Sequence, residues 1–499
     1  MTLHFCHQGT RAFGLPLMML GLTIPTLAGA QLQPPPASPV PVVKLEYDAQ
    51  GNLRRSIQAP SAADFTTSQE YDRLHRRFKV TDARGKPTLL DSNGREDLVR
   101  VTDPRNLITQ YPRNGLGDIT GLVSPDTGAA TETRDAAGNL LTRLDSRGVL
   151  ATHVYDVMNR LTGIAYTRSG EPAQSLSWTY DQTGASFSNG VGRLTSTQYP
   201  GGSTSFAYDP QGRLIRSSQR HAESSVVLAT SYGMDAAGHI VSITYPSGRV
   251  LHIGYSGGVP SNLSLAPSAF APALPLLSEI RLEPAPGGEG PARSWLWHND
   301  GGAVAHERSF DGSGRMTRYP LGGAIRDLTY DAADRVTAYT HLDALSGRAT
   351  AASSALNQVF GYDPLGRLTS VATSVGGWNY SYDDNGNRSL AQYVSAGGTV
   401  SSHHTIDAGS NRLLAIDNPA RTFGHDMAGN VFSDKQAPSV FTRTFDLQNR
   451  MSRVRGSTDD MASCSSATSR CRPRNSSLLP SASAKWSNTL SSKASKVFR

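Results

Sequence analysis

The sequence is poor in the residues from which large hydrophobic cores and long helices are built. Only 38% of its 499 residues are hydrophobic and 7% are aromatic, whereas it holds 48 glycines and 29 prolines. This balance favours many short elements joined by turns. Cysteine is also scarce, with three in all. The spacing of Cys464 and Cys471 is compatible with a small disulfide in an oxidising compartment, and no histidine or second cysteine pair completes a zinc site beside them.

Long hydrophobic runs are missing except at the N-terminus. An apolar stretch from Phe13 to Leu27 follows Arg11 and leads to Ala28-Gly29-Ala30. A short apolar run between a basic residue and an A-x-A sequence is typical of a secretory signal peptide. It is too short for a transmembrane helix, and no other segment is apolar enough to span a bilayer. We therefore predict a signal peptide over 1–30 and a proline-rich spacer over 31–43. We expect a bacterium to export the chain to its periplasm, its surface or the medium.

The excess of positive charge is confined to one end of the chain. The net charge is +7, and residues 451–499 hold nine Lys and Arg against two Asp, so residues 1–450 carry no net charge. A neutral body argues against a nucleic-acid-binding protein. Residues 456–499 are rich in serine, lack glycine after Gly456 and show no apolar period. We expect this basic tail to be disordered.

Motifs for catalysis and cofactor binding are missing as well. The sequence contains neither a G-x-S-x-G nucleophile elbow nor a G-x-x-x-x-G-K-[ST] phosphate loop. Residues 383–387 (DDNGN) offer oxygen ligands for calcium, but their glycine comes too early for an EF-hand loop, and a turn accounts for the same residues. The pair His403-His404 has no flanking Cys or Glu. We predict no enzymatic activity, no cofactor and no metal.

One short phrase is abundant: aromatic-Asp-x-x-Gly-Arg/Asn-apolar. Its copies run from YDAQGNL at Tyr47 to FDLQNRM at Phe445 and include YDPQGRL at Tyr208 and YDPLGRL at Tyr362. Several consecutive copies are 20 or 21 residues apart, and longer steps leave room for inserts. A fixed period of this length indicates a repeat architecture.

The third residue after each Asp identifies the local structure. It is glycine in most copies and otherwise Asn159, Asp334, Asn449 or, in the looser copy YDRLHRR, His75, which are among the few residues that tolerate positive φ. An Asp at the first position and a left-handed residue at the fourth make a type I turn that closes a β-hairpin, and the Asp can accept hydrogen bonds from the turn's own N–H groups. We predict structural turns at Asp48, Gly51, Asp135, Gly138, Asp156, Asn159, Asp209, Gly212, Asp235, Gly238, Asp311, Gly314, Asp331, Asp334, Asp363, Gly366, Asp383, Gly386, Asp426, Gly429, Asp446 and Asn449.

Residues after each turn alternate between apolar and polar, as in RLTSVAT from Arg367 and RLTSTQY from Arg193. Alternation with period two indicates a strand with one covered face. A unit of two strands and two turns cannot bury that face alone, but stacked units can. The sequence therefore predicts an all-β fold in which hairpins stack into one continuous sheet.

These phrases resemble the YD repeats of the Rhs family of bacterial surface and secreted proteins, which are related to insecticidal toxin complexes and teneurins. The resemblance covers roughly Lys44 to Val454, divided into repeats over 44–255, a Pro/Ala/Gly-rich insert over 256–293 that should loop out, and repeats over 294–455. It implies a spiral β-sheet that winds into a hollow shell and, in complete members, encloses a C-terminal toxin. About twenty strand pairs would form part of such a shell and leave open edges.

The chain departs from complete members of the family near its end. Those members carry an aspartate-based self-cleaving motif of the form D-P-x-G-x-x-D, whereas DPQGRLI at Asp209 and DPLGRLT at Asp363 lack the second Asp. We interpret both as ordinary turns and do not expect self-cleavage. The change in composition after Arg455 suggests a truncated or frame-shifted C-terminus.

Two functions are compatible with these features. The first is a non-enzymatic scaffold, a shell or shell fragment that encloses toxin cargo in competition between cells. The second is a cell-surface module that binds carbohydrate, because exposed tryptophans edged by Asp and Asn can hold sugars. The candidates for that role are Trp178, Trp295, Trp297 and Trp378, for which packing within the sheet is the alternative.

Overall fold

The computed structural model describes residues 32–59, 65–285, 288–299 and 302–456. The signal peptide expected over 1–30, the two cysteines of the tail and nearly all of the tail itself lie outside these residues.

Two long antiparallel sheets contain the described strands. The first sheet comprises β1 (Val43–Tyr47), β2 (Leu53–Gln58), β3 (Phe65–Tyr71), β4 (Arg77–Thr81), β5 (Pro87–Ser92), β6 (Leu98–Thr102), β7 (Ile108–Gln110), β8 (Gly121–Ser124), β9 (Gly128–Arg134), β10 (Leu140–Leu144), β11 (Leu150–Tyr155), β12 (Leu161–Thr167), β13 (Gln174–Tyr180), β14 (Leu194–Tyr199), β15 (Gly202–Tyr208), β16 (Leu214–His221), β17 (Val227–Met234), β18 (Ile240–Thr244), β19 (Val250–Ser256), β20 (Val259–Ala266), β21 (Leu274–Ala285), β22 (Gly288–Asn299) and β23 (Gly302–Glu307). The second comprises β24 (Ser309–Phe310), β25 (Met316–Leu321), β26 (Ala324–Tyr330), β27 (Val336–Asp343), β28 (Gln358–Tyr362), β29 (Leu368–Thr373), β30 (Gly376–Tyr382), β31 (Arg388–Ser395), β32 (Gly398–Ile406), β33 (Leu413–Asp417), β34 (Ala420–His425), β35 (Val431–Gln436), β36 (Ser439–Phe445) and β37 (Met451–Gly456).

Within each sheet every strand pairs with the strand before it and the strand after it in the chain. At the junction of the two sheets, the Arg308 amide donates to the Arg293 carbonyl at 2.8 Å, so the wall continues across it. The helical element of the described residues is one short turn, α1 (Ala351–Ser354), and none of them form a helix with the length and apolar character needed to cross a bilayer. The all-β prediction is confirmed.

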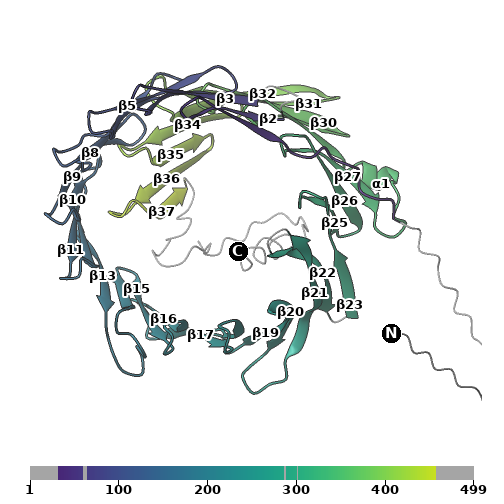
Figure 1. Ribbon diagram of the computed structural model, residues 1–499, viewed down its shortest axis with the longest axis horizontal. Helices are drawn as coiled ribbons and strands as arrows, with labels where there is room; N and C mark the ends of the chain where they lie inside the picture. Colours follow the sequence, from purple (N-terminus) through teal and green to yellow (C-terminus); the bar gives the residue numbers. More distant parts are fainter. Residues whose placement is uncertain (1–31, 60–64, 286–287, 300–301, 457–499) are drawn as a thin grey trace, which may run out of the picture.

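The wall winds around one axis and overlaps itself (Figure 1). The strands β2 to β5 cross the top, and the wall then passes down one side through β8 to β13, along the bottom through β15 to β20, and up the other side through β21 to β27. The strands β30 to β34 then return to the region of β2 to β5, and β35 to β37 lie inside the arc of β8 to β11. The described chain is therefore a spiral of more than one coil, which confirms the predicted spiral sheet.

The segment expected to loop out as an insert is part of the wall. Residues 256–293 form β20, β21 and the first part of β22, each paired with its neighbours. The prolines that suggested a loop fall beside register shifts, with Pro260 opposite Tyr255 and Pro275 opposite Ser264. A bulge tolerates a residue without an N–H group, which is why proline does not interrupt the sheet there.

The proline-rich spacer also has a structural place. Its residues 32–42 run along the turns of β24 to β27, nearly 300 residues later in the chain. The Gln33 carbonyl accepts from Arg318 Nη1 at 2.7 Å, and the Pro39 carbonyl accepts from Arg315 Nη2 at 2.8 Å. Ser38 Oγ accepts from the Tyr330 amide at 2.9 Å. The segment is thus a strap that attaches the first described residues to the second coil.

Burial in this wall is slight, and some of the deepest side chains are charged. Asp434 is 2% exposed and accepts from Arg421 Nε and Nη2, both at 2.7 Å, and from Arg443 Nη2 at 2.9 Å. The Arg421 hydrogen bonds, followed by the hydrogen bond of Arg443 and the charges of both guanidinium groups, lower the pKa of the Asp434 carboxyl to about 2 against the opposing effect of burial. A shielded carboxylate between two guanidinium groups therefore joins three neighbouring strands, β34, β35 and β36.

We predict that Asp434→Asn lowers the free energy of unfolding by about 2 kcal/mol at neutral pH, because the pKa of Asp434 is below its ordinary value of 3.8 only in the folded protein. The carboxylate stabilises the fold above about pH 4, and this contribution is lost as the pH falls toward about 2. Urea unfolding at a series of pH values should show the two proteins converge in acid. A constant difference down to the lowest pH would contradict the prediction.

Candidate functional site: the ladder of aspartate turns and the seam

Each repeat turn is organised by its aspartate. In the turn that follows β28, Asp363 Oδ1 accepts from the amides of Leu365 and Arg367 at 2.9 and 3.0 Å, and Oδ2 accepts from Arg367 Nε at 2.6 Å. The Gly366 amide donates to the Asp363 carbonyl at 2.9 Å, and the strand pairing shifts by one residue at Tyr362. One carboxylate therefore fixes the whole turn and its bulge.

The left-handed residue is present in every turn that the sequence pattern selects. At Gly366 φ is +75°, and the three non-glycine positions Asn159, Asp334 and Asn449 lie between +58° and +66°. The same conformation occurs at the glycines that lie three residues after the other turn aspartates, namely Gly51, Gly138, Gly212, Gly238, Gly314, Gly386 and Gly429. The corresponding aspartates are Asp48, Asp135, Asp209, Asp235, Asp311, Asp383 and Asp426. Each of these left-handed residues donates its amide to the carbonyl of the turn's Asp.

The side chain of the residue after the left-handed position donates a hydrogen bond to the second oxygen, Oδ2, of the turn's aspartate. Asn139 Nδ2 donates to Asp135 Oδ2 at 2.9 Å, and Arg76 Nε donates to Asp72 Oδ2 at 2.7 Å. These side-chain hydrogen bonds are the main cause that lowers the pKa of Asp135 and of Asp72 below the ordinary value. The carboxylates are structural acceptors, already occupied by the turn to which they belong.

An arginine at this position also reaches the next repeat. Arg367 Nη1 donates to the Asp383 carbonyl at 3.0 Å, and its guanidinium lies over the Tyr382 ring, 4.7 Å from the ring centroid. The Tyr382 hydroxyl in turn donates to the Leu368 carbonyl at 2.8 Å. Arg315 with Tyr330, and Arg335 with Tyr362, repeat the arrangement. Consecutive turns are thus joined into a ladder through the aromatic and basic residues of the phrase.

The two edges of the wall differ. Because successive strands are antiparallel, successive turns alternate between edges, and all eleven turns of the predicted set fall on the same one. We call this edge, with the turns that begin at Asp48 through Asp446, the YD edge. The other edge, with turns that begin at Asp82, Asp103 and Asp145, is the return edge. Every coil therefore presents unlike edges above and below.

The YD edge of the second coil rests on the return edge of the first, and we call this contact the seam. Arg105 Nη2 donates to the Asp407 carbonyl at 2.8 Å, and its Nη1 donates to the Ser410 carbonyl at 2.8 Å. Arg147, whose side chain is only 5% exposed, donates to the carbonyls of Asp446 and Leu447 at 3.0 and 3.2 Å. Backbone carbonyls of one coil are thus bound by arginines of the other.

Each coil also supplies a carboxylate that binds a residue of the other coil. Lys86 Nζ lies 2.9 Å from Asp384 Oδ2, and the Lys86 hydrogen bond is the main cause that lowers the pKa of Asp384. In the reverse sense, Asp126 Oδ1 accepts from the Asn411 amide at 2.6 Å. Residues joined across the seam by hydrogen bonds lie 274 to 306 positions apart in the sequence, which is the length of one coil.

Sequence reasoning missed the return-edge turns because they lack the aromatic residue. Each has the same geometry, with positive φ at Gly85, Asn106 and Gly148. Their shared signal is Asp-x-Arg followed by Gly or Asn, as in DARG, DPRN and DSRG. The arginine in the middle of that phrase makes the seam contacts.

The candidate sugar-binding tryptophans do not gather into one site. Trp295 is 9% exposed and stacks on His306 with 4.2 Å between ring centroids, and burial lowers the pKa of His306 to about 4. Trp297 is exposed beside it. Trp378, 42% exposed, lies parallel to Tyr380 and lines a pocket of about 300 Å³ with Arg388, His404, Asn418 and Arg421. No cluster of three metal-type ligands occurs in the described ranges, which include Asp384 and His403.

A known protein family shares the repeat that forms this ladder. The family model described as RHS Repeat matches residues 189–225 and 362–400, and both segments contain a YD-edge turn. The chain therefore contains Rhs repeats. No curated protein sequence matched it.

Several solved structures of Tc toxin components have the same fold. The Rhs-repeat chain superposes on a component of the Photorhabdus luminescens Tc holotoxin pore with a TM-score of 0.67 and 15% identity, over 83% of its own length and 24% of that chain. A complex titled TcdB2-TccC3-Cdc42 gives 0.65 and 15%, with the same coverage. The Rhs-repeat chain therefore spans about a quarter of the length of these relatives.

We predict that Gly366→Val destabilises the Rhs-repeat wall by about 2 kcal/mol, because a β-branched residue is strained at positive φ. Gly366→Asn should cost much less, since asparagine already occupies this position at 159 and 449. Urea unfolding of the two variants measures the difference. Equal losses would show that the left-handed conformation does not limit the choice of residue.

We also predict that Arg147→Ala loosens the end of the second coil. Loss of its two hydrogen bonds across the seam should cost roughly 2 kcal/mol and accelerate amide hydrogen exchange in β36 and β37. Arg143→Ala is the matched control, because Arg143 precedes the same turn but its side chain is 47% exposed and pairs within the first coil. Unchanged exchange in β36 and β37 of Arg147→Ala would mean that the seam does not hold the second coil.

Proposed function

We propose that this Rhs-repeat chain is a non-enzymatic wall that encloses a polypeptide cargo, as part of a toxin-delivery or contact-dependent competition protein. The observation that carries the proposal is the seam. A sheet that overlaps itself after roughly 300 residues, with matched contacts between coils, is suited to enclosing a volume. The carboxylates of the repeat phrase serve the turns and the seam, which supports a structural role for them.

The likeness in fold to toxin-complex components supports the same reading. Because the chain spans about a quarter of those relatives, closure of a complete shell would need further repeats from elsewhere. Export before assembly is part of the proposal and rests on the signal peptide expected over 1–30. The proposed cargo is a polypeptide toxin of unspecified activity.

Carbohydrate binding is the second candidate, and the pocket beside Trp378 favours it. The parallel rings of Trp378 and Tyr380 offer apolar surface for a sugar ring, and Arg388 and Asn418, which line the same pocket, carry hydrogen-bond donors. A site of this kind would bind surface glycans without any enclosed cargo.

Purification from the native host tests both functions. We expect a co-purifying polypeptide that resists added protease until the wall is unfolded, and a mature N-terminus near Gln31 on sequencing. Failure to find a protected polypeptide, together with glycan-array binding that Trp378→Ala abolishes, would reject the wall in favour of the second candidate. Trp297→Ala is the control, because Trp297 is about equally exposed but lies outside that pocket.

A further inference from the structure

The seam is a series of notches, each filled by one turn. A YD-edge turn of the second coil sits between two successive return-edge turns of the first. The turn at Asp407 lies between Arg105 and Asp126, contacted from one side by Arg105 and from the other through Asn411. The turn at Asp446 continues the series, because Arg147 binds its carbonyls and Gln448 lies 3.4 Å from Gln174.

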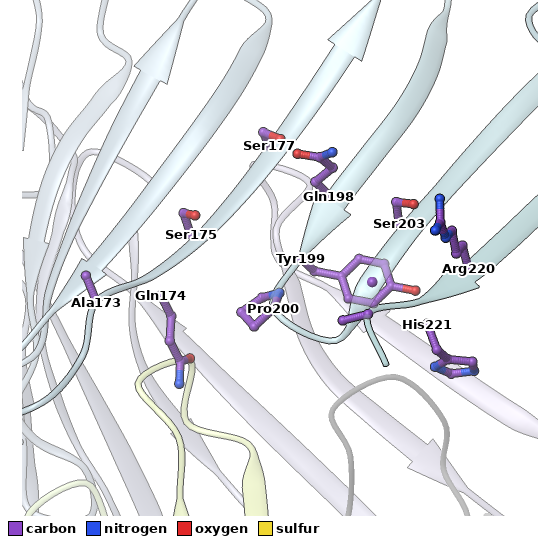
Figure 2. Close-up of a pocket in the computed structure, with 12 residues that line it drawn as sticks. Ala173, Gln174, Ser175, Ser177, Gln198, Tyr199, Pro200, Ser203, Arg220 and His221 are labelled. Atoms are coloured by element: carbon purple, nitrogen blue, oxygen red, sulfur yellow. The ribbon is translucent and has the colours of Figure 1, made fainter. Parts of the chain in front are cut away.

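The next notch along the return edge is an open pocket. It begins at Gln174, the last residue of the first coil with a described contact across the seam, and extends over the return-edge ends of β13 to β16. Its volume is about 520 Å³, and its polar lining includes Ser177, Gln198, Tyr199, Arg220 and His221. Figure 2 shows these side chains around the space, with the hairpin of the second coil ending beside Gln174.

The chemistry of the pocket matches that of the filled notches. In the filled notches, basic side chains such as Arg105 and Arg147 bind the carbonyls of an acidic turn. Arg220 brings a guanidinium group to the open notch, and His221 adds an imidazole beside it. Charge and continuity with the seam therefore both favour a further Asp-turn hairpin as the occupant.

A suitable turn is exposed on the same chain. The turn at Asp446 has an apolar second residue, Leu447, which is only 2% exposed in its notch, and asparagine at its left-handed position. The turn Asp156–Asn159 has the same features, with Val157 second and asparagine last. It lies on the YD edge of the first coil, where the side chain of Val157 is fully exposed.

We propose that the pocket at the return-edge ends of β13 to β16 receives the Asp156–Asn159 turn of a second copy of this chain. The sequence of residues 457–499 contains no aromatic-Asp-x-x-Gly phrase that could supply such a turn from the same chain. Turn and pocket are different surfaces, so the contact is head-to-tail, and a pair of copies keeps one turn and one pocket free for further association. The chain therefore associates into open-ended assemblies.

Sedimentation velocity of the full chain tests this arrangement. Wild type should form concentration-dependent oligomers, and Val157→Asp on the turn or Arg220→Glu in the pocket should each weaken association by at least about tenfold. Leu74→Asp is the matched control, because Leu74 is 60% exposed in another YD-edge turn of the first coil, one whose second residue is Arg73. This control should associate like wild type.

Mixing the two defective variants gives the decisive measurement. Val157→Asp keeps an intact pocket and Arg220→Glu keeps an intact turn, so a mixture should form one-to-one dimers that cannot extend. This recovery also shows that neither variant has misfolded. A monomeric wild type, variants that associate normally, or a mixture that stays monomeric would overturn the proposal. Association that depends instead on residues 457–499 would also overturn it, by identifying the tail as the occupant.

Discussion

The hydrogen bonds that one aspartate carboxylate accepts within its own turn are the constraint on which the rest of this structure depends. Asp363 binds two amides through one oxygen and the Arg367 guanidinium through the other. The bound arginine then contacts the next turn and the next tyrosine. Each turn consequently places the group that positions its successor, and order passes along the wall from neighbour to neighbour as in other repeat proteins.

This dependence explains how a thin wall can be stable with so little burial. Among the described residues only twelve hydrophobic side chains are buried, several of them alanines. A single sheet has no second layer to pack against, so backbone pairing, cation–π contacts and the turn carboxylates take a larger share of the stabilisation. Charged residues such as Arg318 and Asp327 are buried for the same reason, because their pairing joins neighbouring strands without a hydrophobic layer.

The sequence allowed the repeat, the hairpin turns and the all-β class to be predicted because each depends on local chemistry. Gly366 and Asn159 occupy turn positions with positive φ, which few residue types adopt without strain. The turns can therefore be recognised from residue type and spacing, with no knowledge of distant contacts. The partners of Arg147 lie about 300 residues away, so no local pattern could identify them. The prediction of a loop over 256–293 was wrong for a related reason. Pro260 and Pro275 indicate a loop when only the neighbouring residues are considered, but in the structure each lies beside a register shift between paired strands, where proline is tolerated.

The contacts of the seam tolerate wide changes in sequence. Arg105 and Arg147 bind backbone carbonyls, which every residue possesses, so a substitution in the opposing turn preserves the contact as long as the turn keeps its shape. The fold therefore constrains the aspartate, the left-handed position and the following Arg or Asn, and constrains the residues between them much less. A chain can retain 15% identity and still superpose over 83% of its length, because turn geometry and the length of one coil set the path of the wall.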